Sequence, residues 1–142
     1  MDVNEKELND KLLEMEYLRR ELEDSVNVLS TLQYTQESIA SSLLGLDSLK
    51  DGVKQVLVPY SSEIFFEGEI KNTSLPLVNI GSNIFKRMDL ERLKTMLNER
   101  LKTVTDNVQD LLKNIDEMQS RSKKLEESIS AMYEKYRDSQ AK

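Results

Sequence analysis

Two stripes of apolar residues, spaced mostly three and four positions apart, run along the two ends of this chain. The first stripe follows Leu8, Leu12, Met15, Leu18, Leu22, Val26, Leu29, Leu32, Gln36, Ile39, Leu43 and Leu46. The second follows Leu97, Leu101, Val104, Val108, Leu111, Ile115, Met118, Ser122, Leu125, Ile129, Met132 and Tyr136. A mean step of about 3.5 residues is that of a coiled-coil seam. The pattern predicts a mostly α-helical protein built on a long two-helix coiled coil.

Helix signals place the ends of both coiled-coil segments. The first helix is expected over residues 4–51, because Asp51-Gly52 can close a helix with a left-handed residue. The second is expected over residues 89–139, without a glycine or proline inside it. Asp89 is a good N-cap, and Met88 and Leu93 occupy the two positions of a hydrophobic staple.

The segment between the helices, residues 55–87, has the composition of short strands. Val56-Leu57-Val58-Pro59 is an apolar run, and the next run, from Ile64 to Ile70, alternates acids with apolar residues at its end. Residues 71–74 have turn chemistry, and residues 77–81 are predicted as the returning strand. Residues 81–83 form a second turn before a short fourth strand at Ile84-Phe85. We therefore predict two small β-hairpins.

Charge favours helices that fold back on one another. Residues 1–24 carry nine acids and four bases, whereas residues 121–142 carry six bases and four acids. An antiparallel pair brings these oppositely charged ends together, and a parallel dimer would place like charges side by side. We therefore expect an antiparallel coiled coil with the two hairpins at the end where the helices are connected.

The predicted hairpins are too apolar to stay in water at the end of a two-helix coil. Small hairpins are marginal alone, and their open edges invite further strands. We expect hairpins from several chains to pair into one shared β-barrel, and we assign this assembly to Val56, Leu57, Val58, Phe65, Phe66, Ile70, Val78 and Ile80. Obligate oligomerisation follows from this expectation.

Composition excludes several classes of function. With 142 residues the chain is expected to form a single domain, residues 1–142. It has no Cys and no His, which removes thiolate and imidazole catalysis and Cys/His metal sites. A net charge of −6 argues against nucleic acid, and no apolar run is long enough for a membrane span or a signal peptide. We expect a cytoplasmic protein that is not an enzyme and has no cofactor and no metal.

The insert carries a resemblance to a known family. Val56-Leu57-Val58-Pro59-Tyr60, the stretch from Glu67 to Thr73, and Leu77-Val78-Asn79-Ile80-Gly81 follow one another as in prefoldin subunits of the alpha class. The resemblance implies a hexamer of two alpha-class and four beta-class subunits, held by a double barrel of hairpins. It also implies an ATP-independent holdase, which captures non-native client proteins between coiled-coil tips and passes them to a group II chaperonin.

The coiled-coil tip is where we predict client binding. Apolar residues from both helices meet there in an antiparallel pair: Leu8, Leu12, Leu13, Met15, Ile129, Met132, Tyr133 and Tyr136. Leu12-Leu13 and Met132-Tyr133 are adjacent pairs, and a two-helix seam is expected to bury one member of each. The other member then offers an apolar contact to an unfolded chain. The alternative is that these are ordinary single apolar residues on a surface.

Two other functions fit the coiled coil. A structural scaffold needs the same seams but gives no reason for the hairpins between them. A prefoldin-like subunit of another complex or of a filament explains both features and stays open beside the holdase.

Overall fold

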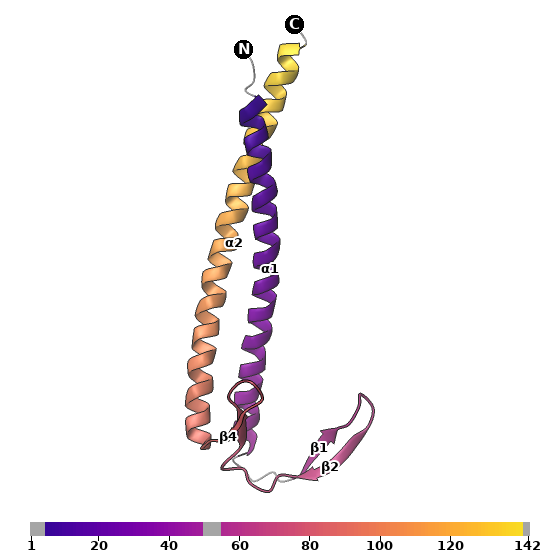
Figure 1. The fold of residues 1–142 in the computed structure, drawn as a ribbon, viewed down its shortest axis with the longest axis vertical. Coiled ribbons are helices and arrows are strands. Elements are labelled where there is room, and N and C mark those ends of the chain that lie inside the picture. Colours follow the sequence, from indigo (N-terminus) through magenta and orange to yellow (C-terminus); the bar gives the residue numbers. More distant parts are fainter. Residues whose placement is uncertain (1–4, 50–54, 141–142) are drawn as a thin grey trace. The chain divides into compact units, whose positions relative to one another are not determined.

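The computed structural model describes residues 5–49 and 55–140 of the chain. Their elements are α1 (Glu5–Ser48), β1 (Gln55–Pro59), β2 (Phe65–Glu69), β3 (Leu77–Asn79), β4 (Phe85–Arg87) and α2 (Leu90–Gln140) (Figure 1). The predicted helix end at Asp51-Gly52 lies outside the described residues. The fold is mostly helical, with two long helices, as the apolar stripes predict, and two small antiparallel hairpins between them, as the composition of residues 55–87 predicts.

The chain divides into two compact units, which we describe separately. The terminal unit comprises residues 1–33 and 106–142, and the hairpin unit comprises residues 34–105. In the terminal unit Arg121 forms an ion pair with Glu14, while Glu21, further along α1, shares a hollow with Asn114, earlier in α2. The helices therefore run antiparallel in this unit.

The helices of the hairpin unit are also antiparallel. Gln36 Nε2 donates a hydrogen bond to Thr105 Oγ1 at 2.9 Å, and Lys94 Nζ donates one to Asp47 Oδ1 at 2.9 Å. Asp47 comes after Gln36 in α1, whereas its partner Lys94 comes before Thr105 in α2, so the two helices run in opposite directions. Gln36 interrupts the apolar seam, and its hydrogen bond to Thr105 gives this half-buried amide a partner inside the coiled coil.

The seam of α1 is more regular than its apolar residues alone indicate. Twelve of its buried and half-buried positions step alternately by three and four: 8, 11, 15, 18, 22, 25, 29, 32, 36, 39, 43 and 46. The half-buried Glu14, Thr35 and Ala40 lie next to these positions. Lys11 and Ser25 therefore occupy seam positions, and the prediction that Leu12 and Val26 lie in the seam is wrong, because both are exposed. The aliphatic part of Lys11 is half-buried in the seam, and its amine lies 4.0 Å from the Glu7 carboxylate.

The seam of α2 matches its predicted stripe from Leu97 to Met132. Val108, Ile115, Leu125 and Ile129 are buried, and the remaining positions of this stretch are half-buried. Only Tyr136, the last predicted member, is exposed. The described residues from 133 to 140 are all exposed, so the last two turns of α2 contribute little to the seam.

The two hairpins are confirmed, but one strand pairing is wrong. β1 pairs with β2 and β3 pairs with β4, each antiparallel, so residues 71–74 connect two hairpins and do not turn β2 back onto β3. The first turn is closed by Tyr60, whose backbone N–H donates to Ile64 O at 2.9 Å. Residues 71–74 still form a turn, because Asn72 Oδ1 accepts a hydrogen bond from the backbone N–H of Ser74 at 3.0 Å.

The turn of the second hairpin has a left-handed backbone. Ser82 and Asn83 have φ values of 49° and 56°, and the N–H of Ile84 donates to Gly81 O at 2.9 Å. Two central residues with positive φ define a type I′ turn, whose twist matches that of a two-stranded ribbon. The Gly-Ser-Asn sequence thus explains why β3 and β4 pair with each other.

Asp89 caps α2, and we expect Asp89→Ala to destabilise the helix. Its Oδ1 accepts hydrogen bonds from the backbone N–H of Glu91 at 2.9 Å and of Arg92 at 3.3 Å. Loss of an N-cap costs about 1 kcal/mol, so thermal unfolding followed by circular dichroism should begin at a lower temperature. Asp89→Ser, which keeps an acceptor, should behave like the wild type. An unchanged unfolding temperature for Asp89→Ala would show that the cap is dispensable.

Candidate binding surfaces

The predicted client-binding residues lie in the terminal unit with different degrees of burial. Leu12, Leu13, Tyr133 and Tyr136 are exposed; Leu8, Met15 and Met132 are half-buried; Ile129 is buried. The hydroxyl of Ser122 lies 3.5 Å from Met15 Sδ, so Met15 contacts the opposite helix within the seam. The exposed four residues are therefore those available to a partner in the isolated chain.

The prediction that the seam buries one member of each adjacent pair holds for Met132-Tyr133 and is wrong for Leu12-Leu13. Met132 is half-buried and Tyr133 is 50% exposed, as expected for adjacent residues on a helix. Both Leu12 and Leu13 are exposed, however, because the seam takes Lys11 and leaves the pair beside it. The surface at this end therefore holds one more leucine than the sequence pattern predicts.

The first hairpin has an apolar face. Val56 lies opposite Gly68 and Val58 lies opposite Phe66, so these four residues share one side of the two-stranded sheet. The Tyr60 ring packs edge-to-face against Phe66, with ring centroids 5.6 Å apart. A Cβ on Gly68 would lie 3.1 Å from Val58 Cγ2, which shows how little space this face leaves for a side chain there. The face therefore combines apolar side chains with a glycine that adds no side chain of its own.

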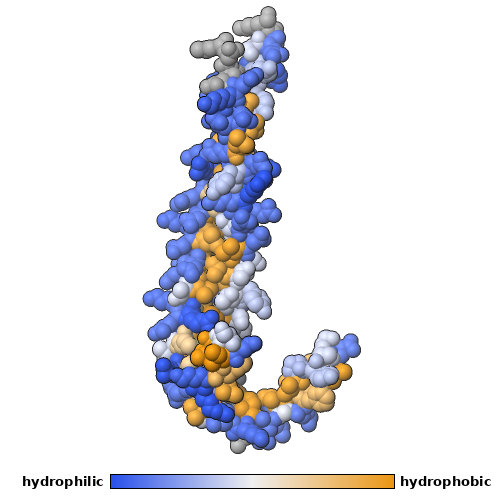
Figure 2. Space-filling model, viewed as in Figure 1, coloured by the Kyte–Doolittle hydropathy of each residue, from blue (hydrophilic) through white to orange (hydrophobic). Residues whose placement is uncertain are grey.

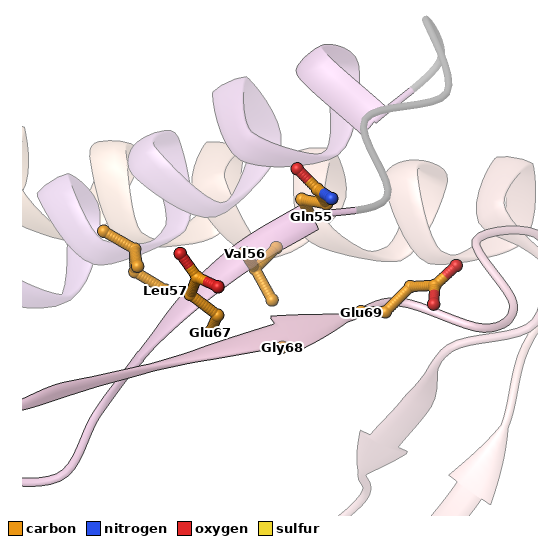
Figure 3. A pocket seen from close by; sticks show the side chains of 6 residues that line it. All are labelled: Gln55, Val56, Leu57, Glu67, Gly68 and Glu69. Carbon is orange, nitrogen blue, oxygen red and sulfur yellow. The ribbon is translucent and has the colours of Figure 1, made fainter.

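The opposite face of the first hairpin carries acids. Glu67 lies opposite Leu57, and Glu69 lies opposite Gln55. These residues, with Val56 and Gly68, line a hollow of about 420 Å³ (Figure 3). Phe65, opposite Pro59, adds an exposed aromatic ring to the same face.

The second hairpin also exposes apolar side chains. Leu77, Ile80, Ile84 and Phe85 are exposed, while Val78 is half-buried. Its charged residues are basic: Lys86 lies opposite Val78, and Arg87 lies opposite Leu77. Near its turn, Ile80 shares a hollow of about 410 Å³ with Met96 and Arg100 of α2.

The predicted assembly residues thus lie on the hairpins or directly beside them, and most are exposed. Leu57, Val58, Phe65, Phe66 and Ile80 are exposed, and Val56, Ile70 and Val78 are half-buried. Sequence reasoning missed six exposed apolar residues of this region: Tyr60, Ile64, Leu75, Leu77, Ile84 and Phe85. In Figure 2 apolar side chains reach the surface along the β1–β2 hairpin and where the two helices meet.

Neither a metal-binding cluster nor a membrane-spanning helix occurs among the described residues. Residues 5–49 and 55–140 hold no cluster of three or more carboxylates, His or Cys that could bind a metal ion. None of the helices described by the structure is long and apolar enough to cross a membrane.

Two antiparallel helices joined through two small hairpins define a class of coiled-coil subunit, and comparison with known proteins identifies it. A family model described as prefoldin subunit matches residues 5–135. The chain belongs to the prefoldin family, whose members are chaperone-type subunits that assemble with other prefoldin subunits.

Relatives and a solved structure agree with this assignment. The chain is 30% identical to prefoldin subunit alpha of Thermofilum pendens over 109 residues, covering 77% of this chain and 84% of the relative. It is 20% identical to prefoldin subunit alpha of Archaeoglobus fulgidus, covering 93% and 98%. Its fold is similar to filamentous PFD from Methanocaldococcus jannaschii, with a TM-score of 0.64 and 21% identity over 84% of this chain and 98% of that one.

Proposed function

We propose that this chain is an alpha-class subunit of an ATP-independent holdase. In this proposal the terminal unit captures non-native proteins, and the hairpin unit holds two alpha-class and four beta-class chains together as a hexamer. The exposed Leu12, Leu13, Tyr133 and Tyr136 at the end of the coiled coil are the observation that supports capture. Similarity to prefoldin subunits alpha supports the assembly.

The chemistry of the terminal unit suits weak binding of many sequences. Leucine and tyrosine side chains offer apolar contact without a shaped pocket, which favours flexible apolar segments over one specific ligand. The half-buried Met15 and Met132 have adaptable side chains beside them. We place this activity in the cytoplasm, where the captured client would be transferred to a group II chaperonin, and we propose no catalytic step.

Suppression of aggregation tests the proposal directly. The chain, co-purified with beta-class prefoldin subunits, is mixed without ATP with a chemically denatured protein that aggregates on dilution. We expect light scattering to fall as the complex approaches the client concentration, because each client is held by several apolar contacts. Scattering that stays at the level of a bovine serum albumin control would reject the holdase role.

A second candidate is a subunit of a different prefoldin-like assembly. The structural neighbour is a filamentous PFD, and the chain is 25% identical to an RNA polymerase II subunit 5-mediating protein homolog of Dictyostelium discoideum, of which it covers 24%. Native mass spectrometry with and without beta-class partners separates these possibilities. A six-chain mass supports the chaperone hexamer, and an open series of masses from this chain alone supports a filament.

A further inference from the structure

We propose that the hydrogen bond between Gln36 and Thr105 fixes the register in which α1 and α2 pack against each other in the hairpin unit. Register here means which residue of α1 lies opposite which residue of α2. The proposal concerns the coiled coil within a single chain, so it does not depend on the proposed function.

The apolar residues of the seam do not define one register by themselves. Seam positions of α1 and of α2 both repeat every seven residues, so a slip of one helix by seven residues again brings seam positions together. Coiled coils often select one alignment through charged residues at the edges of the seam. From Ser25 to Leu46, however, α1 has a single charged residue, Glu37. Another kind of contact is needed to select the register in this stretch.

Gln36 and Thr105 supply that contact. Gln36 occupies a seam position of α1, Thr105 follows the seam residue Val104 of α2, and both side chains are half-buried. Gln36 Nε2 donates its hydrogen bond to Thr105 Oγ1 at 2.9 Å. An amide and a hydroxyl that bond each other in an apolar seam are satisfied, whereas the same groups beside apolar side chains lose their hydrogen bonds to water without replacement.

The ion pair near the end of α1 has the same register. Asp47 lies eleven residues after Gln36, and its partner Lys94 lies eleven residues before Thr105. Lys94 Nζ is 2.9 Å from Asp47 Oδ1, but Asp47 is exposed. Because exposed ion pairs contribute little, this pair selects the alignment less strongly than the half-buried hydrogen bond does.

A slip of seven residues in either direction places the Thr105 hydroxyl against a leucine. Seven residues along α1 from Gln36 lie Leu43 in one direction and Leu29 in the other, and both are half-buried seam residues. Neither side chain can donate or accept a hydrogen bond. Loss of its partner at one half-buried polar group lowers the population of such an alignment about tenfold.

The two directions of slip differ at Gln36. Seven residues along α2 from Thr105 lie Leu112, toward the C-terminus, and Asn98, toward the N-terminus. Beside Leu112 the Gln36 amide has no partner, whereas Asn98 offers it a second amide. The pair therefore disfavours the slip toward Leu112 more strongly than the slip toward Asn98.

The register determines where the hairpin segment is attached. α1 ends at Ser48 and α2 begins at Leu90, and the two hairpins lie between them in the chain. Because a helix rises about 1.5 Å per residue, a slip of seven residues moves one of these helix ends about 10 Å past the other. The hydrogen bond inside the coiled coil thus sets the relative height of the two points at which the hairpin segment is joined to the helices.

Spin labels on the full chain test the proposal. The sequence has no Cys, so Ser38→Cys and Glu91→Cys place one label on each helix, at exposed positions of the hairpin unit. Each labelled chain is diluted into the unlabelled chain of the same variant, and the distance between its two labels is measured by double electron–electron resonance. We expect one narrow distance when Gln36 and Thr105 are both present.

Gln36→Leu combined with Thr105→Val should add a second distance, displaced by up to about 10 Å. The population of slipped chains should rise about tenfold or more, because the apolar pair no longer distinguishes the registers. The unfolding temperature should equal or exceed that of the wild type, since replacing both partners of a hydrogen bond by apolar groups of similar shape is nearly neutral or stabilising. A single unchanged distance would overturn the proposal, and a lowered unfolding temperature beside it would show that the pair only adds stability.

Three further variants separate register from packing. Thr105→Ser keeps the hydroxyl and should keep the single distance. Ser25→Leu also places a leucine at a polar seam position, but it leaves Gln36 and Thr105 intact and should keep the single distance as well. Thr105→Val alone removes only the hydroxyl from a side chain of the same shape, so it should show the second distance even if the double variant does not fold. A second distance in Ser25→Leu, or its absence from Thr105→Val, would contradict the role assigned to the pair.

Discussion

Val58→Ser combined with Phe66→Ser is expected to leave both helices folded and to prevent assembly with partner subunits. The two side chains lie opposite each other on the apolar face of the first hairpin, and they are 49% and 58% exposed in the isolated chain. Full burial of a valine or phenylalanine is worth about 1.5–3 kcal/mol, and these residues have much of that burial still to gain. Loss of both should weaken each interface about tenfold to a hundredfold.

The matched control is Val28→Ser with Tyr34→Ser on α1, where the exposed fractions are 52% and 74%. These residues are at least as exposed as Val58 and Phe66, but they lie outside the hairpins. Native mass spectrometry of the chain co-expressed with beta-class subunits measures the outcome. If both double variants give the same mass as the wild type, the apolar face of the first hairpin is not an assembly surface.

The helices could be predicted from sequence because seam positions alternate by three and four residues along most of their length. The second stripe repeats every seven residues, and its members from Leu97 to Met132 are buried or half-buried. In α1 the same rule was obscured at Leu12 and Val26, since a search for apolar residues selects the leucine or valine next to the true seam position. A strict alternation of three and four, applied without regard to residue type, would have placed Lys11 and Ser25 correctly.

The hairpins were predictable in number but not in pairing. Residues 71–74 and residues 81–83 both have turn chemistry, and the sequence does not say which of them reverses a strand. The reversal between β1 and β2 falls on residues 60–64, a stretch that carries a weaker turn signal after Pro59. Strand pairing depends on contacts between residues distant in sequence, and a local pattern carries little information about them.

For the candidate binding residues, the segment in which each lies was predictable from sequence, but the exposure of its side chain was not. Hydrophobicity selected segments that do expose apolar side chains, but the exposure of each side chain depends on helix register and on strand partners. Ile129 and Tyr136 illustrate the difference: both belong to the predicted stripe and to the predicted client-binding residues, yet Ile129 is buried in the seam and Tyr136 is exposed. For this reason the exposed residues of the predicted client-binding site, Leu12, Leu13, Tyr133 and Tyr136, are the better positions for a test of client binding.

Replacement of Leu12, Leu13, Tyr133 and Tyr136 by serine should preserve assembly and remove most suppression of client aggregation. All four side chains are exposed, so their loss takes little from the free energy of unfolding. They would supply apolar contact to a non-native chain, and several weak contacts acting together determine how long that chain is held. Removal of residues 1–15 and 129–142 should give the same result with a larger change, since it also deletes the half-buried members of the set.

Leu44→Ser with Tyr34→Ser is the control for these variants, because Leu44 and Tyr34 are 73% and 74% exposed yet lie in the hairpin unit. Loss of holdase activity in the control as well would mean that exposed apolar residues of the helices bind clients wherever they lie. Unchanged suppression by the truncated chain, with its assembly verified by mass, would remove client binding from the terminal unit altogether. A selective loss in the fourfold variant is the outcome that assigns capture to Leu12, Leu13, Tyr133 and Tyr136, since only their side chains differ from the wild type.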